Sequence, residues 1–191
     1  VTVETLRKQL GVVPQEPFLF QGTIAYNIAF GRPDATREEV VAAAKAANAH
    51  EFIAALPGGY DTEIQEESTN LSLGQRQLVC LARVILSQPK ILVLDEATSS
   101  VDLRTEGLIQ DAMETLMSGR TSLVIAHRLA TVQRASKILV IDGGRIVEEG
   151  PIDQVIAEPQ HSYTKGLIAS ARIDQVPPGE RLPSVADFYR A

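Results

Sequence analysis

Two adjacent carboxylates follow an unbroken apolar run near the middle of the chain. The run is Ile91 to Leu94, and Asp95 and Glu96 come directly after it. A short run of this kind predicts a strand that is buried on both faces of a parallel sheet. Ligands of open α/β sheets collect at the carboxyl ends of strands, where one carboxylate can hold Mg²⁺ and its neighbour can activate a water. The alternative is an aspartate that caps the next helix.

A helix just before this strand is the element that must position it. Ser72 and Gly74 open a segment whose apolar side chains recur three and four residues apart, which predicts an amphipathic helix. Pro89 ends the helix, because proline lacks an amide donor and crowds the preceding turn. Cys80 lies on the apolar face and is the only cysteine, so we expect a packing residue and no internal disulfide.

Length and composition indicate one globular domain. The chain has 191 residues, of which 45% are hydrophobic and 22% charged. No apolar run approaches the roughly 18 residues that a membrane-spanning helix needs, and the first residues do not resemble a signal peptide. The net charge of −6 argues against nucleic acid as the main partner, since phosphate binding requires a basic face.

Further elements alternate along the chain. We expect strands at 10–13, 121–126 and 137–142, and a hairpin partner for the last at 145–149. We expect helices from Gly22-Thr23 and over 36–56, 104–117, 128–134, 151–157 and 161–171. Residues 60–70 read as a loop, and 176–191 as a tail or docking strap. Strands that alternate with helices from Lys90 to Asp142 indicate an α/β sheet.

Five motifs in register resemble the nucleotide-binding domain of ABC transporters of the exporter type. They are VVPQ (12–15), similar to the Q-loop; LSLGQ (71–75), similar to the signature; ILVLDE (91–96), similar to the Walker B strand with its glutamate; SSVD (99–102), similar to the D-loop; and His127 after TSLVIA, similar to the switch histidine. Five matches in this order are far more specific than any one of them.

The resemblance implies a P-loop NTPase (RecA-like) core with an ABC α-helical subdomain, in a partial ATPase domain over 1–175. The Q-loop and the helical subdomain would occupy about 16–88, core strands 89–150 and C-terminal helices 151–175, followed by the tail at 176–191. The GxxxxGK[ST] pattern of a Walker A loop does not occur, because no lysine here follows a glycine. We therefore expect a fragment that lacks the N-terminal part of the domain and that is inactive alone.

The resemblance also implies catalytic roles and the ligands ATP and Mg²⁺. Asp95 would hold Mg²⁺, and Glu96 would polarise the water that attacks the γ-phosphate. His127 would contact that phosphate, and Gln15 would reach Mg²⁺ or the attacking water. In isolation, Gln15 reads as an exposed loop residue and His127 as a turn histidine.

Four further residues would bind across a dimer, according to the resemblance. Ser72, Gly74 and Gln75 at a helix N-terminus would hold the γ-phosphate of ATP bound to a second nucleotide-binding domain, in a head-to-tail dimer. Asp102 would organise the contact between the two domains, although by itself it reads as a helix cap.

Two departures from the family pattern bear on this dimer. Leu73 stands where the commonest signature has glycine, and it adds bulk and loses the freedom to adopt φ > 0. The loop TEIQEES (62–68) carries Gln65, Glu67 and Ser68 where exporters usually have glycine, arginine and glycine. Together they favour a heterodimer slightly over a homodimer.

The leading interpretation is the ATP-hydrolysing part of an ABC exporter on the cytoplasmic side of a membrane, with Phe18 to Ile28 touching the transmembrane domain. One alternative is a soluble ABC-type ATPase of DNA repair or translation, against which TIAYNI after the Q-loop and the lack of a basic face count. The other is a non-catalytic module that binds or regulates a partner, against which intact Glu96 and His127 count. The membrane domain chooses the transported substrate, so this sequence does not identify it.

Overall fold

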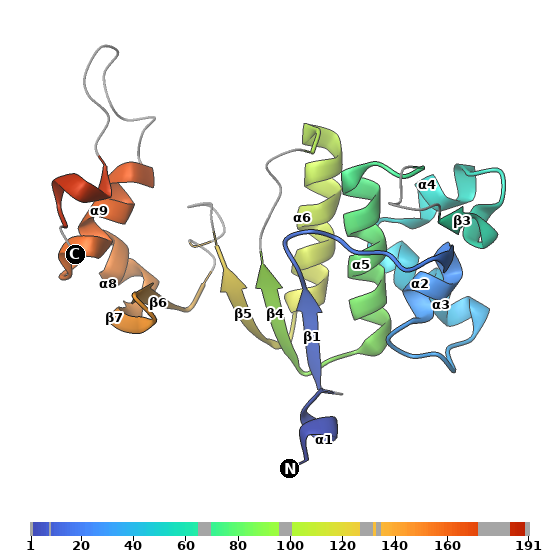
Figure 1. Cartoon of the computed structure of the whole chain (residues 1–191), viewed down its shortest axis with the longest axis horizontal. Coiled ribbons are helices and arrows are strands. Elements are labelled where there is room, and N and C mark those ends of the chain that lie inside the picture. Colours follow the sequence, from blue (N-terminus) through green and yellow to red (C-terminus); the bar gives the residue numbers. More distant parts are fainter. Residues whose placement is uncertain are drawn as a thin grey trace. The chain divides into compact units, whose positions relative to one another are not determined.

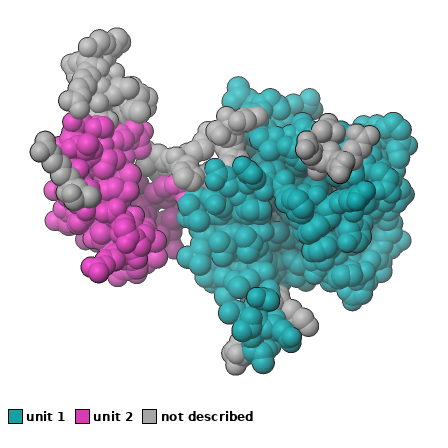
Figure 2. Space-filling view, in the orientation of Figure 1, with its two compact units in different colours: residues 1–125 teal, residues 126–191 magenta. Residues whose placement is uncertain are grey.

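The computed structural model describes residues 2–7, 9–64, 70–95, 101–126, 132, 135–171 and 184–189. The chain divides into two compact units, residues 1–125 and 126–191, which Figure 2 colours teal and magenta. Glu96 and His127 lie outside the described residues, as do most of the helix expected at 128–134 and the altered loop positions 65–68.

Unit 1 holds a three-stranded parallel sheet with the strand order β1-β4-β5. Its strands are β1 (Leu10–Val13), β4 (Ile91–Asp95) and β5 (Thr121–Ile125), which confirms the strands predicted there. A short helix that the sequence did not predict, α1 (Val3–Arg7), precedes β1. The parallel pairing of strands separated by helices confirms the predicted α/β class.

One face of this sheet is buried and the other is partly open. Leu92 and Leu94 of β4 are fully buried, whereas Leu123 and Ile125 of β5 are 53% and 52% exposed. Because successive side chains of a strand point to opposite faces, Asp95 lies on the open face, which also carries Ile125. The prediction that the apolar run of β4 is buried on both faces is therefore wrong within unit 1, where the helices cover one face.

Two helices of unit 1 stand beside the strands, α5 (Leu73–Ser87) and α6 (Leu103–Met117) (Figure 1). Their buried side chains join those of β1 and β4 in one core cluster. Helix α5 ends as predicted, with Gln88 in the left-handed region at φ 49° and Pro89 directly after it. Cys80 is buried in α5 and its thiol donates to the carbonyl of Phe18 at 3.5 Å. Burial raises the pKa of this thiol, which agrees with a packing role.

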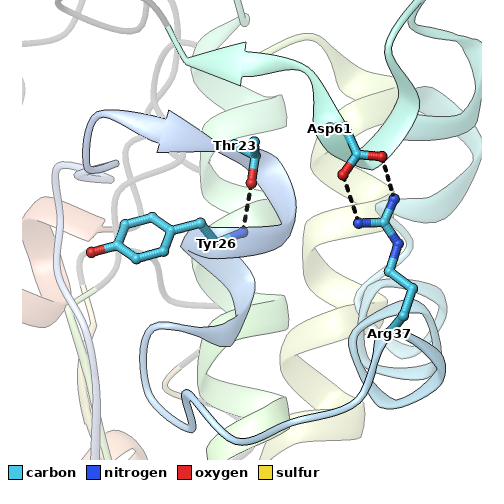
Figure 3. A network of polar contacts seen from close by, with 4 residues as sticks. All are labelled: Thr23, Tyr26, Arg37 and Asp61. Atoms are coloured by element: carbon cyan, nitrogen blue, oxygen red, sulfur yellow. Dashed lines mark hydrogen bonds and ion pairs between the residues drawn. The ribbon is translucent and has the colours of Figure 1, made fainter.

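A helical part of unit 1 packs against α5. It contains α2 (Ile24–Ala29), α3 (Arg37–Ala46), α4 (His50–Ala55) and a 3₁₀ turn, η1 (Gly59–Asp61). Thr23 caps α2 by accepting from the amide of Tyr26 at 3.0 Å, as the predicted helix start requires (Figure 3). Arg37 donates to both carboxylate oxygens of Asp61 at 2.9 Å, which ties the start of α3 to η1 (Figure 3).

The predicted loop over 60–70 and the predicted continuous helix over 36–56 both need correction. The loop contains the end of η1 and a short strand, β3 (Glu63–Ile64), which pairs antiparallel with β2 (Gly22–Thr23). The helix is broken between α3 and α4 at Asn48, whose φ is 56°. Asparagine tolerates this left-handed conformation, and here its Nδ2 donates to the carbonyl of Leu108 at 3.0 Å. This distant contact is invisible to local composition.

From residue 135 to residue 171, unit 2 follows the predicted order of elements. β6 (Lys137–Asp142) and β7 (Arg145–Pro151) form an antiparallel hairpin, followed by α8 (Ile152–Ala157) and α9 (Ser162–Ala171). In the predicted tail, the 3₁₀ turn η4 (Val185–Asp187) packs against α9, and the ring of Tyr189 lies 5.5 Å from that of Tyr163. This part of the tail is therefore docked. None of the described helices combines the length and the apolarity that crossing a membrane requires.

Candidate functional site

The carboxyl edge of the sheet brings two of the predicted site residues to one place. β1 ends at Val13, and Gln15 follows shortly after it with an exposed side chain. β4 ends at Asp95, whose side chain is half-buried. Since Val13 pairs with Leu94, the parallel register places Gln15 and Asp95 at the same edge of the sheet. This is the edge at which α/β proteins bind ligands.

Strands β4 and β5 both end at this edge, and the two remaining catalytic candidates follow them in the sequence. Asp95 pairs with Ile125, so the two strands end side by side. Glu96 is the next residue after Asp95, and His127 follows Ala126 after β5. Both residues lie outside the described part of the chain, and their catalytic roles stay predictions.

The position of Asp95 fits a magnesium ion that is shared with a phosphate. Mg²⁺ keeps several waters and is bound through one or two protein carboxylates together with substrate phosphate oxygens. Asp95 offers one half-buried carboxylate on the open face of the sheet, and Gln15 offers an exposed amide oxygen at the same edge. These two donors suit a hard cation that prefers oxygen ligands.

The start of α5 is closed by a reciprocal capping box. The Oγ of Ser72 accepts from the amide of Gln75 at 3.2 Å, and the Oε1 of Gln75 accepts from the amide of Ser72 at 2.9 Å. The box does not use the amides of Leu73 and Gly74 or the hydroxyl hydrogen of Ser72. The first turn of α5 also contains no acidic residue that would repel an anion. These groups are therefore the ones that the helix start can offer to a phosphate.

Leu73 does not strain the backbone of the predicted signature. It is the first residue of α5, and neither it nor Gly74 is among the described residues with positive φ. Its amide consequently has the orientation of an ordinary first-turn amide. The leucine side chain is half-buried and adds bulk at this position, and the main chain accommodates it.

Asp102 is the N-cap of α6. Its Oδ1 accepts from the amide of Thr105 at 3.0 Å. Hydrogen bonds from the amide and the hydroxyl of Thr105 hold the pKa of the exposed Asp102 carboxyl below its usual range. The cap that the sequence suggested as an alternative is thus present, and the predicted contact with a second domain stays a prediction.

Sequence reasoning missed a polar network that joins α5 to the segment after β1. Arg83 donates from Nε to the carbonyl of Asn27 at 2.8 Å, from Nη2 to its Oδ1 at 3.0 Å, and from Nη1 to the carbonyl of Phe18 at 3.1 Å. Asn27, which is fully buried, donates to the carbonyls of Phe20 and Thr23 at 2.9 and 3.0 Å. In the sequence, the sign of this network is the amide side chain of Asn27 inside the apolar stretch TIAYNIAF.

The network adjoins an aromatic patch, which consists of Phe18, Phe20, Tyr26 and Phe30. Phe20 stacks on Phe30 with ring centroids 3.9 Å apart, and Phe18 and Tyr26 meet the stack edge-on. The guanidinium of Arg83 lies 5.2 Å from the centroid of Phe20 and 5.8 Å from that of Phe30. Phe18 and Tyr26 are 61% and 50% exposed. Contiguous exposed aromatic surface of this kind indicates an interaction site.

A parallel sheet with an acid at its carboxyl edge, preceded by a capped helix start, is the arrangement expected of an α/β nucleotide-binding protein and is consistent with a P-loop NTPase core. The sequence profile of the ABC transporter family matches residues 1–99. The chain therefore belongs to the ABC transporter family.

Several longer proteins are similar to it. The uncharacterized ABC transporter ATP-binding protein YfiC of Bacillus subtilis is 52% identical over 158 residues, which cover 83% of this chain and 26% of that protein. A putative multidrug export ATP-binding/permease protein of Staphylococcus aureus is 51% identical over 163 residues, or 84% of this chain and 28% of the relative. Among solved structures, a bacterial Atm1-family ABC exporter with ATP bound matches with a TM-score of 0.78 and 44% identity, over 95% of this chain and 31% of that one. The chain thus spans about a quarter of the length of these curated relatives.

Proposed function

We propose that this chain forms part of the ATP-binding and ATP-hydrolysing portion of an ABC exporter, at the cytoplasmic face of a membrane. The observation that carries the proposal is its likeness to an exporter with ATP bound, at 44% identity over 95% of the chain. The shared carboxyl edge of β1, β4 and β5, where Gln15 and Asp95 lie, supports the same function.

Each residue of the proposed site has a chemical task that its side chain can perform. Asp95 holds Mg²⁺, which neutralises charge on the phosphates of ATP. Gln15 presents its amide oxygen to the ion or to the attacking water, and Glu96 orients that water and accepts its proton. His127 donates to the γ-phosphate, where negative charge develops.

A second nucleotide-binding domain completes the proposed site. The amides of Leu73 and Gly74 and the hydroxyl of Ser72 donate to the γ-phosphate of ATP bound by the partner, while Asp102 lies at the contact between the two domains. The ordinary backbone at Leu73 supports a working signature, so a homodimer needs no special adjustment there. Purifying the natural polypeptide alone and with its neighbouring gene product, and counting turnover sites in each, distinguishes a homodimer from a heterodimer.

The aromatic patch is the proposed contact with the transmembrane domain. Arg83 of α5 contacts the ring of Phe30 and hydrogen-bonds to the carbonyls of Phe18 and Asn27. A displacement of the patch would therefore be transmitted to α5. Tyr26→Ala removes an exposed ring that has only an edge contact within the patch. It should reduce transport more than ATP turnover. Phe188→Ala, which removes an exposed ring in unit 2, serves as the control.

The proposed function is tested by measuring ATP turnover of the natural polypeptide that carries this sequence, with and without Mg²⁺, in membrane vesicles. Magnesium-dependent turnover together with ATP-dependent uptake into inverted vesicles is the expected result. Turnover by a polypeptide that never partitions into membranes would instead support a soluble ABC-type ATPase. No turnover would support a binding or regulatory module.

A further inference from the structure

The first turns of α5 and α6 touch at Gly74 and Thr105. A Cβ placed on Gly74 would lie 2.4 Å from Cγ2 of Thr105 and 3.0 Å from Cγ1 of Val101. Real side chains do not approach so closely, and Thr105 is a short β-branched residue with little freedom to move away. Because φ of Gly74 is not positive, glycine is required here for space and not for backbone conformation.

Thr105 has a second contact, which it makes through its main chain. Its amide donates to Oδ1 of Asp102 at 3.0 Å and so completes the cap of α6. One residue therefore touches Gly74 through its methyl group and Asp102 through its amide. Gly74 belongs to the start of α5 that is proposed to meet a phosphate, and Asp102 to the proposed contact between the two domains.

We infer that Thr105 is a positioning residue, which fixes the start of α5 and the cap of α6 relative to each other so that both meet the partner domain together. The structural basis of the inference is the Gly74–Thr105 contact. Its effect on ATP turnover rests on the proposed function. A glycine at this place in a phosphate-binding turn has an obvious competing explanation, namely that only a bare backbone can approach the phosphate. The two explanations predict different outcomes when the methyl group of Thr105 is removed.

Size complementation separates them. In Gly74→Ala the new Cβ meets Cγ2 of Thr105, whereas in the double variant Gly74→Ala/Thr105→Ser that methyl group is absent and the hydroxyl and amide remain. Thr105→Ser alone is the background control. Gly107→Ala in α6 is the matched glycine control, because a Cβ there meets nothing within 4 Å. It also measures what alanine adds through helix propensity.

Two measurements are made on the same four variants. For the 191-residue chain, we expect Gly74→Ala to lower Tm by about 3–10 °C through overpacking, and the double variant to recover most of that loss. For the natural polypeptide, at a temperature where all variants are folded, we expect Gly74→Ala to lower ATP turnover by about 10- to 100-fold through misplacement of the site. The double variant should return to within about threefold of Thr105→Ser, which is under about 1 kcal/mol.

Each result has a definite meaning. A double variant that stays as slow as Gly74→Ala overturns the inference, even if its Tm recovers, because removal of the Thr105 methyl group then does not restore the site. If Gly74→Ala does not fold, the comparison of the double variant with Thr105→Ser still decides. Absence of turnover in the unaltered polypeptide contradicts the proposed function instead, and leaves the Tm comparison as the test of the contact.

Discussion

Arg83 on α5 donates to both the backbone oxygen and the side-chain oxygen of Asn27 on α2, at 2.8 and 3.0 Å. A third bond reaches the carbonyl of Phe18 at 3.1 Å, so one planar guanidinium joins α5 to the segment that carries the aromatic patch. Lysine has the same charge but a single ammonium group, which cannot reach these three oxygens in the same geometry.

Arg83→Lys should therefore lower the free energy of unfolding by about 1–3 kcal/mol, because buried oxygens lose their donors. Chemical denaturation of the 191-residue chain measures it. The exposed Arg104 on α6 supplies the control, since Arg104→Lys should change the free energy of unfolding by less than about 0.5 kcal/mol. Equal effects of the two substitutions would show that the network contributes no stability.

The break between α3 and α4 gives a second prediction. Asn48→Ala should destabilise the chain by about 1–3 kcal/mol, because alanine in the left-handed region is strained and the bond to Leu108 is lost. Asn48→Gly loses the same bond without the strain, so it should cost about 0.5–1.5 kcal/mol. If glycine proves as damaging as alanine at this position, backbone strain is not the reason for the asparagine.

The cap of α6 predicts a pH dependence of stability. The pKa of Asp102 is lowered in the folded chain, so its stabilising effect is complete above its unfolded pKa and is lost as pH falls through the folded pKa. Asp102→Asn keeps a capping oxygen but does not ionise. The difference in the free energy of unfolding between the unaltered chain and Asp102→Asn should shrink as pH falls below about 4. A difference that stays constant from neutral to acid pH would contradict the assignment.

The 191-residue chain alone should bind MgATP weakly. It contains no GxxxxGK[ST] sequence, and the lysine and amides of such a loop make most contacts with the triphosphate in P-loop NTPases. Calorimetric titration of the chain with ATP and Mg²⁺ should therefore give no micromolar affinity. A measured Kd in the micromolar range would reveal a nucleotide site that Gln15, Asp95 and the start of α5 do not account for.

The sequence predicted those parts of the fold whose causes are local. The start of α5 near Ser72 and Gly74 follows from apolar residues that recur three and four positions apart, and the end of the helix follows from Pro89. The strand ending at Asp95 follows from an apolar run of the right length. Each of these signals can be seen within a few neighbouring residues.

Contacts between distant segments could not be predicted in this way. Asn48 breaks a helix that its own neighbours favour, because its side chain reaches Leu108 on α6. The space beside Gly74 is filled by Thr105, and nothing within α5 indicates that. That Gln15 and Asp95 lie at the same edge of the sheet depends on the parallel register of β1 and β4. Such relationships depend on tertiary packing, which overrides local preference.

In the proposed mechanism, the acid that follows Asp95 activates water for ATP hydrolysis. The most direct test is steady-state ATP turnover by the natural polypeptide with Glu96→Gln, measured beside the exposed control Glu51→Gln and together with nucleotide binding. Glu96→Gln should leave MgATP binding intact and slow hydrolysis by at least about 10²-fold, the scale expected for loss of a general base, while Glu51→Gln remains unchanged. A Glu96→Gln variant whose turnover stays within a few-fold of the unaltered polypeptide would contradict the role assigned to this carboxylate.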